Sequence, residues 1–385
     1  MTNKTLKLKH ILKEGLDAIL ISSVSNIVYL TGYCGFSYFE REAFLVITAQ
    51  PQGLTYKTPG VLGYILTDGR YSEAVTDILP SLPKYELIET SSKNTIEKVF
   101  ENLAKKIKKL GIEENDISLS ESKKFKKYFK LISIKDLRDL RVVKDENEIK
   151  KIKKACKIGD EAFDFILKKL KLGITEKQIA FELEFFIKRN GANISFPPIV
   201  AFGTNSSIPH HQPTNNELIT HNPVLFDFGV KVDNYCSDMT RTVFFGKADN
   251  KFKKIYNTVL TAQQKAIEKL FHLGGGPEQS RRNSSEVNSR GIKATDVDAV
   301  ARKYIIDQGF PAIPHSLGHG IGIEVHEPPR LSPKSKDILK EGMVFSIEPG
   351  IYIPGFGGVR IEDIIVLEEN GPRLLTHSPK HLIEI

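Results

Sequence analysis

The sequence predicts an α/β domain at the N-terminus and a second, larger domain after it. Apolar runs typical of strands alternate with helix-like patterns over residues 1–140. Charged residues interrupt this apolar pattern near residues 137–146. The chain has 385 residues, of which 40% are hydrophobic, so it can form two or three domains with sizeable cores. We therefore expect domains at residues 1–140 and 141–385.

The first domain reads as alternating helices and strands. The apolar residues Ile65 and Leu66 are followed by Asp68-Gly69, a dipeptide that strongly predicts a turn. Pro80 ends the helix that follows this turn. Nothing in this region reads as a phosphate-binding loop or a nucleophile elbow. Helices are expected at 6–13, 71–79 and 96–110, and strands at 17–21, 43–48, 85–88 and 117–119.

The second domain begins with two amphipathic helices. Apolar residues at helical spacing run from Ile149 to Leu170, and Gly173 ends that helix. Thr175 and Gln178 have the spacing of a capping box, which starts the second helix. Further on we expect a strand at 199–202, a helix at 251–273, an exposed flexible insertion without an assigned role at 274–290, and a helix at 295–308 that Thr295 caps.

Five potential metal-ligand side chains lie in short motifs of this domain: Asp227, Asp238, His319, Glu348 and Glu362. Apolar residues before three of them indicate buried strands that deliver a side chain at their end. An acidic residue at a strand end is more often an edge or turn residue, so each motif alone is weak. Together, four carboxylates and one imidazole favour two divalent cations, because buried carboxylates without a counter-cation are very costly.

The two aspartates can meet through a hairpin. They are eleven positions apart (238 − 227), and the segment Val232-Asp233-Asn234 between them reads as a turn. Asp233 is a competing acid, but a position in the turn predicts that it is solvated. Residues 240–244 alternate in polarity like an adjoining strand.

The order of these motifs resembles metallopeptidase family M24, which contains methionine aminopeptidase, Xaa-Pro aminopeptidase and prolidase. The match runs from Arg141 to the C-terminus. More loosely, Thr67-Asp68-Gly69-Arg70-Tyr71 resembles a segment of the domain that precedes the catalytic domain in the Xaa-Pro members. The resemblance implies a creatinase/prolidase-type α/β domain followed by an α+β catalytic domain with the pita-bread fold. In this architecture the first domain serves dimer contacts and narrows the active-site mouth, although a plain scaffold is an alternative.

The resemblance also implies how the ligands are shared. Asp227 would bind one ion, and His319 and Glu348 would bind the other. Asp238 and Glu362 would bridge the two ions. Mn(II) is the favoured metal, with Co(II) or Zn(II) as alternatives.

Further residues match active-site positions of the family. His210, after a proline, would contact the substrate near the leaving nitrogen, and the alternative is a surface-loop histidine. His326 would stabilise the oxyanion, and Glu348 would shuttle a proton. Arg330 can hold a substrate's free carboxylate, although a surface ion pair is an equally good interpretation. Arg360 is expected to orient the ligand carboxylates from behind.

The implied function is hydrolysis of the Xaa-Pro bond at the N-terminus of peptides or in Xaa-Pro dipeptides, by attack of a metal-bridging water. The proline nitrogen carries no N–H, so peptidases that rely on this donor cleave such bonds poorly. A methionine aminopeptidase-like enzyme, a creatinase-like amidinohydrolase and a non-catalytic binding homologue are the alternatives. The extra N-terminal domain argues against the first of them, and the intact ligand set argues against the other two. The choice between dipeptidase and aminopeptidase stays open.

The lysine pattern and the lack of long apolar runs argue against nucleic-acid and membrane partners, and cysteine usage indicates the compartment. The net charge of +8 comes largely from lysine-rich stretches such as Lys105-Lys106-Ile107-Lys108-Lys109, which suit solvated helix faces better than a nucleic-acid surface because no aromatic stacking motif accompanies them. Three distant cysteines exclude a disulfide scaffold and fit a reducing cytoplasm. We see no signal peptide and no membrane-spanning run. The resemblance to the family implies a proline-containing peptide as substrate and a homodimer as the assembly.

Overall fold

The computed structural model of the chain describes residues 12, 15–48, 63–82, 85–134, 136–271 and 291–385. It divides into two compact units, Met1–Arg141 and Val142–Ile385. The helix expected at 6–13, apart from residue 12, and the insertion expected at 274–290 lie outside the described residues. Within the described part of the chain, no helix is long and apolar enough to cross a membrane.

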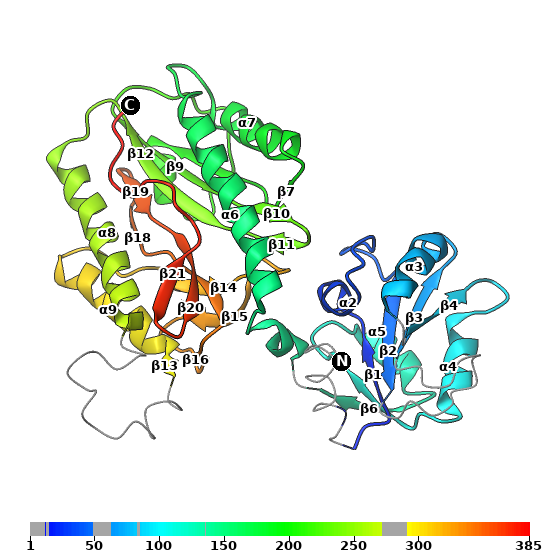
Figure 1. Cartoon of the computed structure of the whole chain (residues 1–385). Helices are drawn as coiled ribbons and strands as arrows, with labels where there is room; N and C mark the ends of the chain where they lie inside the picture. Colours follow the sequence, from blue (N-terminus) through cyan, green and yellow to red (C-terminus); the bar gives the residue numbers. More distant parts are fainter. Residues whose placement is uncertain (1–11, 13–14, 49–62, 83–84, 135, 272–290) are drawn as a thin grey trace, which may run out of the picture. The chain divides into compact units, whose positions relative to one another are not determined.

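A mixed six-stranded sheet forms the core of the first unit (Figure 1), in the order β4-β3-β2-β1-β5-β6. Central strand β1 pairs antiparallel with β2 and parallel with β5, and all four of its residues are buried. The strands are β1 Ala18–Ile21, β2 Ala43–Thr48, β3 Gly63–Asp68, β4 Tyr85–Thr90, β5 Lys109–Ile112 and β6 Lys130–Ser133. The helices are α2 Val24–Thr31, α3 Ser72–Ile78, α4 Ile96–Ala104 and α5 Leu119–Phe125, with 3-10 turns η1 Leu79–Ser81 and η2 Leu137–Arg141. This unit is the predicted α/β domain.

Two sequence expectations in this unit were wrong. The helix expected at 96–110 ends at Ala104, and its last residues belong to β5. The Asp17 carboxylate accepts from the backbone N–H groups of Lys108 and Lys109, which draws this segment alongside β1. The strand expected at 117–119 is instead the start of α5, because Ser118 caps that helix in a capping box with Glu121.

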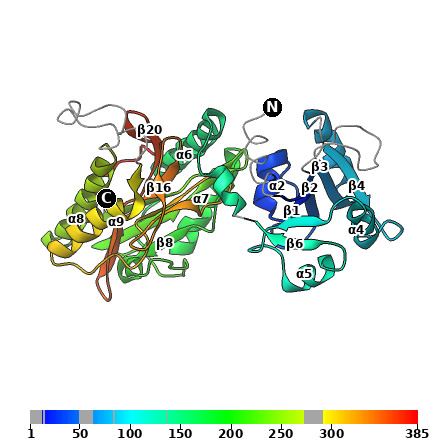
Figure 2. The same ribbon diagram turned by 90° about the horizontal axis from the view of Figure 1, so that it is seen from below.

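The second unit contains two pairs of helices, and each pair packs on antiparallel strands. Helices α6 Glu146–Leu167 and α7 Glu176–Arg189 share a core with the sheet β12-β9-β8. Helices α8 Asn250–Leu270 and α9 Ala294–Asp307 lie side by side in both views (Figures 1 and 2) and share a core with the sheet β15-β14-β17-β20-β21. The site described below lies where strands of these two sheets meet.

The strands of this unit are mostly short. They are β7 Asn193–Ile194, β8 Ile199–Phe202, β9 Asn222–Phe228, β10 Val230–Val232, β11 Tyr235–Cys236, β12 Met239–Phe245, β13 Ile292–Lys293, β14 Gly318–Gly320, β15 Glu327–Leu331, β16 Ile338–Leu339, β17 Val344–Ile347, β18 Gly350–Ile353, β19 Gly357–Arg360, β20 Asp363–Glu368 and β21 Gly371–Leu374. A 3-10 turn, η3 Gly203–Ser207, follows β8.

Several local predictions in this unit are confirmed. The capping box of Thr175 and Gln178 starts α7, and β8 has the expected bounds. The turn between the two aspartates forms, with positive φ at Asp233 and Asn234. The N-cap expected at Thr295 was wrong, because α9 begins at Ala294 and Thr295 is its second residue.

The two threonines give a matched test of helix capping. We expect Thr175→Ala to lower the free energy of unfolding by about 1 kcal/mol, because the Thr175 hydroxyl accepts from the Gln178 N–H. Thr295→Ala removes no cap and should change stability by less than about 0.5 kcal/mol. Urea denaturation followed by circular dichroism measures both values, and equal losses would contradict this assignment of the caps.

Candidate metal centre

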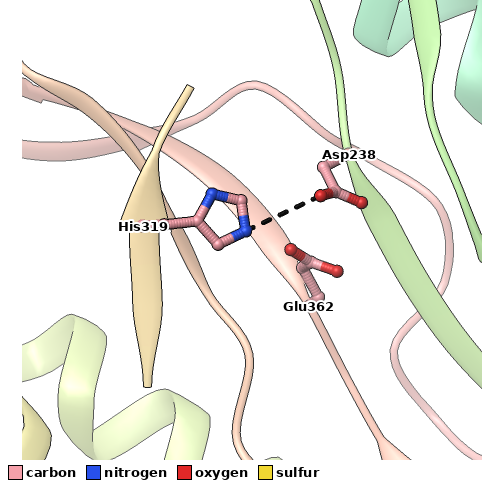
Figure 3. Close-up of side chains that lie close together, drawn as sticks. All are labelled: Asp238, His319 and Glu362. Atoms are coloured by element: carbon pink, nitrogen blue, oxygen red, sulfur yellow. Dashed lines mark ion pairs between the residues drawn. The ribbon is translucent and has the colours of Figure 1, made fainter. Parts of the chain in front are cut away.

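Three side chains from distant segments converge on one point (Figure 3). Asp238 lies just before β12, His319 is the middle residue of β14, and Glu362 lies between β19 and β20. One ligand atom of each lies within 4.8 Å of the others. The Nε2 atom of His319 is 3.7 Å from Oδ2 of Asp238. This grouping has the size and the chemistry of a metal site.

Glu348 and Asp227 lie beside these three. Glu348 directly follows β17, and its Oε1 is 3.4 Å from Nε2 of His319. Asp227 is on β9, opposite Thr240 of the antiparallel strand β12. Because side chains alternate along a strand, Thr240 shares a face with Asp238 two positions earlier, and Asp227 joins them there. The structure thus brings all five predicted ligand side chains to one region.

Thr240 ties two of the contributing segments together. Its hydroxyl donates to Oε2 of Glu362 at 2.8 Å and accepts from Nε of Arg360 at 3.0 Å. Its backbone carbonyl accepts from the N–H of Glu362 at 3.1 Å. A strand residue of β12 therefore fixes the position of a carboxylate that follows β19.

Glycine allows the histidine strand to come close to β17. A Cβ atom at Gly318 would lie 1.9 Å from the carbonyl oxygen of Ser346, so only glycine fits there. The N–H of His319 then donates to Oγ of Ser346 at 3.1 Å. The same hydroxyl donates to Oε1 of Glu348 at 3.3 Å. Ser346 thereby holds the imidazole-bearing backbone and the neighbouring carboxylate in register.

Arg360 is a buried cation behind the ligand carboxylates. One terminal nitrogen donates to Oδ2 of Asp227 at 2.6 Å. The other donates to the Tyr352 hydroxyl at 2.8 Å and, more weakly, to the carbonyl of Pro209 at 3.4 Å. Its planar fork can hold these groups in fixed directions. The hydrogen bond to Asp227 is the kind of contact that the expected orienting role requires.

The environment of the clustered carboxylates disfavours their ionised form. Burial raises the pKa of Asp238, Glu362 and Glu348, and repulsion from neighbouring carboxylates adds to the effect for all three. One buried oxygen each of Asp227, Asp238 and Glu362 has no hydrogen-bond donor among the described residues. Buried acceptors without donors are costly, and divalent cations would supply the missing partners. The donor set, four carboxylates and one imidazole, fits such ions.

Two predicted histidines lie at the edge of this group. The ring of His326 packs edge-on against His319, with centroids 4.3 Å apart, and it is accessible to solvent. The surrounding protein still removes much of its hydration, and this loss, followed by the charge of His319, lowers the pKa of His326 to about 4. His210 is exposed and lies near enough for its charge to contribute to this lowering.

Arg330 faces the same way as His319. The two residues are opposite each other in the β14–β15 ladder, so their side chains share a face. The Arg330 Nε donates to Oγ of Ser316 at 2.7 Å, while the side chain remains exposed. Its charge contributes to the lowered pKa of both His319 and His326. A guanidinium therefore stands at the rim of the site.

The sequence interpretation overlooked His315 and assigned no role to Tyr352. Nε2 of His315 lies 2.8 Å from the Tyr352 hydroxyl, and Nδ1 lies 3.9 Å from Oε2 of Glu348. Burial raises the pKa of Tyr352 to about 12, although the positive charge of Arg360 acts to lower it. The available signal was spacing, since His315 precedes His319 by four residues and Tyr352 follows Glu348 by four.

Comparison with known proteins places this geometry in a family. Residues 150–369 match metallopeptidase family M24, and residues 6–143 match the creatinase/prolidase N-terminal domain. An Xaa-Pro dipeptidase of Pyrococcus horikoshii is 34% identical over 96% of this chain and 95% of its own. An Xaa-Pro dipeptidase structure from Bacillus anthracis is 33% identical, with a TM-score of 0.84 over 99% of both chains. An X-Pro aminopeptidase structure from Thermotoga maritima is 32% identical, with a TM-score of 0.79 over 96% of this chain and 98% of its own.

These matches confirm the resemblance and the two-domain architecture, a creatinase-type N-terminal domain followed by a pita-bread catalytic domain. They also agree with the cluster of carboxylates and imidazole, because the family is one of metallopeptidases. The chain belongs to metallopeptidase family M24.

Proposed function

We propose that this peptidase hydrolyses the Xaa-Pro bond of short peptides and that Xaa-Pro dipeptides are its preferred substrates. The observation that carries the proposal is the convergence of Asp227, Asp238, His319, Glu348 and Glu362, three of which bury an oxygen without a hydrogen-bond donor in the described structure. Relatives over nearly the full length are named Xaa-Pro dipeptidases. The intact set of ligand-type side chains argues against a non-catalytic homologue.

Two divalent ions would be held as the family pattern suggests. Asp227 would bind one ion, His319 and Glu348 the other, and Asp238 and Glu362 would lie between them. Arg360 and Thr240 would keep Asp227 and Glu362 in place through the hydrogen bonds described above. When bound, such ions lower the pKa of a water molecule and polarise a carbonyl. We propose Mn(II), with Co(II) or Zn(II) as alternatives that this oxygen-rich donor set accepts.

Glu348 is positioned to hold and pass on a proton. Its Oε1 faces His319 and accepts from Ser346, and its Oε2 faces His315 at 3.9 Å. A carboxyl between two imidazoles can take a proton from the attacking water and deliver it to the leaving nitrogen. Proline nitrogen must gain this proton to leave as a secondary amine.

His326 and His210 would contact the reacting bond. With a pKa of about 4, His326 is neutral at ordinary pH and can donate a hydrogen bond to the developing oxyanion without bringing an extra charge into the site. His210 would lie near the leaving nitrogen. The exposure of both rings leaves them free to meet a substrate.

Arg330 supplies a reason to prefer dipeptides. Its Nε is fixed by Ser316, and its side chain shares a face with His319. In the proposed complex, this guanidinium meets the free carboxylate of a peptide that ends one residue after the cleaved bond, whereas the carboxylate of a longer peptide lies elsewhere. Arginine binds carboxylates through two parallel hydrogen bonds, which gives this contact both strength and direction.

We also propose a cytoplasmic homodimer. Cys34, Cys156 and Cys236 are all unpaired, which suits a reducing compartment. The dimer rests on similarity to other proteins of the family, and light scattering on the purified chain tests it directly.

A matched pair of aspartates tests the metal centre. We expect Asp238→Asn to reduce kcat/KM on an Xaa-Pro dipeptide by more than about 100-fold. Loss of a residue that only supports a metal ligand lowers activity by about 10- to 100-fold, and loss of a proposed ligand should lower it further. Asp233→Asn, in the solvated turn with its carboxylate near Lys154, should leave kcat/KM unchanged. Metal content by mass spectrometry should fall only in the first variant. Wild-type turnover by Asp238→Asn would defeat the proposal.

Removal of metal should make stability depend on pH in a defined direction. The raised pKa of Asp238, Glu348 and Glu362 means that the folded apo-protein keeps protons that the unfolded chain releases at about pH 4. Stability of the apo-protein is therefore lost as pH rises above that value, toward the raised folded values. We expect the gain in Tm on adding Mn(II) to be larger at about pH 8 than at about pH 5, because cations replace these protons.

Differential scanning fluorimetry with and without chelator measures this gain. The Asp238→Asn variant is the control, because removing one of the mutually repelling carboxylates should weaken the pH dependence of the apo-protein. A metal-induced gain that is the same at both pH values would contradict the assignment of these carboxylates to the metal centre.

Substrate length tests the role of Arg330. We expect Arg330→Lys to lower kcat/KM on an Xaa-Pro dipeptide by about 10- to 100-fold, the range for losing a charge-assisted hydrogen bond. Turnover of an Xaa-Pro-Xaa tripeptide, whose carboxylate lies elsewhere, should change by less than about threefold. Arg373→Lys, in a half-exposed pair with Glu368, is the matched control. Equal losses on both substrates would rule out carboxylate recognition by Arg330.

A further inference from the structure

A buried carboxylate outside the metal centre organises the loop that carries His210. Glu176, the first residue of α7, is fully buried. Its Oε1 accepts from the N–H of Phe202 at 2.8 Å and from the Asn205 amide at 2.9 Å. Its Oε2 lies 2.9 Å from Nε2 of His211 and accepts from the Thr214 N–H at 2.9 Å and the Thr214 hydroxyl at 2.7 Å.

The number of these contacts explains how a charge can be buried there. Burial acts to raise the pKa of the Glu176 carboxyl, but the hydrogen bonds from Asn205, His211, Phe202 and Thr214 together outweigh it and hold the pKa below its usual value. The N-terminus of α7 also favours a negative charge at this position. An ionised carboxylate with several donors has a narrow range of allowed positions, so the donors on residues 202–214 are fixed with it.

The opposite side of the same loop is bound to the metal centre. Arg360, which also holds Asp227, donates to the carbonyl of Pro209. The N–H of Gly358 donates to Oγ of Ser206 at 2.8 Å. A Cβ atom at Gly358 would lie 2.2 Å from the carbonyl oxygen of Ser206, so the loop and β19 touch backbone to backbone. The loop is therefore packed against the strand that leads to the ligand Glu362.

His210 sits between these two attachments. Its predecessor Pro209 is held by Arg360 on the side of the metal centre, and its successor His211 is held by Glu176 on the side of the core. His211 is buried, whereas His210 is exposed. Fixing both neighbours fixes the backbone of His210 and therefore the position from which its side chain leaves the loop. Neither Glu176 nor His211 contacts the ligand carboxylates in the described structure.

We propose that Glu176 is a positioning residue for catalysis, which fixes the loop 203–214 so that His210 points at the substrate. This rests on the proposed role of His210 in Xaa-Pro hydrolysis. Glu176 acts on the reaction through the loop and through His210. It contributes neither a metal ligand nor a proton.

The conservative change Glu176→Gln is the primary test. Glutamine keeps the size and one acceptor but turns an N–H₂ group toward donors that now lack an acceptor, so the loop should loosen. We expect kcat/KM on an Xaa-Pro dipeptide to fall by about 10- to 100-fold, the scale of a small misplacement of a substrate-contacting group. Metal content should remain that of the wild type, because all five proposed ligands are untouched.

A double-mutant cycle separates positioning from a general structural role. If Glu176 acts through His210, the kcat/KM of the double variant Glu176→Gln/His210→Ala should equal that of His210→Ala to within about twofold. The reason is that loosening the loop cannot misplace a side chain that has already been removed. Losses that multiply would overturn the proposal, as would wild-type kcat/KM in Glu176→Gln. An inert His210→Ala would overturn it as well, and would remove His210 from the proposed mechanism.

Hydrogen exchange provides a readout that does not depend on activity. Peptides covering 203–214 should exchange faster in Glu176→Gln, while peptides of β17 and β20 should not change. The matched control is Glu113→Gln in the first unit, a buried carboxylate that accepts from the N–H groups of Ser22 and Ser23 and from the Asn26 amide. Glu113→Gln should lower the free energy of unfolding. It should leave kcat/KM unchanged, both alone and when combined with His210→Ala. Unchanged exchange in 203–214 would count against the proposal.

A milder variant covers the case in which Glu176→Gln does not fold. Thr214→Val removes only the hydroxyl donor at 2.7 Å and keeps the shape of the side chain. It should shift kcat/KM and loop exchange in the same direction by a smaller factor, and no shift in either would overturn the proposal. The proposed function is tested separately, since wild-type turnover of the dipeptide and its loss in Asp238→Asn do not depend on Glu176.

Discussion

Repulsion among buried carboxylates is the constraint on which the second unit depends. Asp227, Asp238, Glu348 and Glu362 are brought together with little access to water; burial raises the pKa values of Asp238, Glu348 and Glu362, and repulsion from neighbouring carboxylates adds to the effect. Such a cluster is unfavourable by itself, so the surrounding structure must hold it in place. The cluster in turn creates a strong and specific attraction for divalent cations. Divalent cations bound at this cluster would relieve the repulsion among its carboxylates.

The hydrogen bonds around the cluster show how it is held. Thr240 connects β12 to Glu362, Ser346 connects the His319 backbone to Glu348, and Arg360 connects Asp227 to Tyr352. Each of these residues joins segments that are far apart in the sequence. Within the described residues, this network leaves one buried oxygen each of Asp227, Asp238 and Glu362 without a donor, and such oxygens are available to a cation.

A second buried acid, Glu176, shows the same principle with a different outcome. Both of its oxygens receive donors from residues 202–214, which suits the proposed role in fixing that loop. The contrast lies in the number of protein donors each carboxylate receives. A buried carboxylate that receives hydrogen bonds from the protein can hold a loop in place. A buried carboxylate that lacks such donors remains available to bind a cation.

The sequence by itself determined much of this protein. Motif order predicted the family and the two-domain architecture, because these depend on residue type and spacing. The five side chains that it singled out as ligands lie in one region of the structure, and their role stays a prediction. Local signals also predicted the capping box at Thr175 and the turn at Asp233, since both depend on interactions between neighbouring residues. Where long-range contacts competed, local signals failed. Lys109 and Leu110 read as helix but form a strand, because Asp17 and β1 bind that segment.

Tertiary structure alone decided how the site is supported. No local sequence signal pairs Arg330 with Ser316 or Glu176 with Thr214, since each pair is brought together by packing of whole elements. The direction of a side chain depends in the same way on its surroundings: His210 and His211 are adjacent in the sequence, yet one is exposed and the other buried. Residue types and their order specify which chemistry is available, whereas the three-dimensional fold decides which groups meet and which remain without partners.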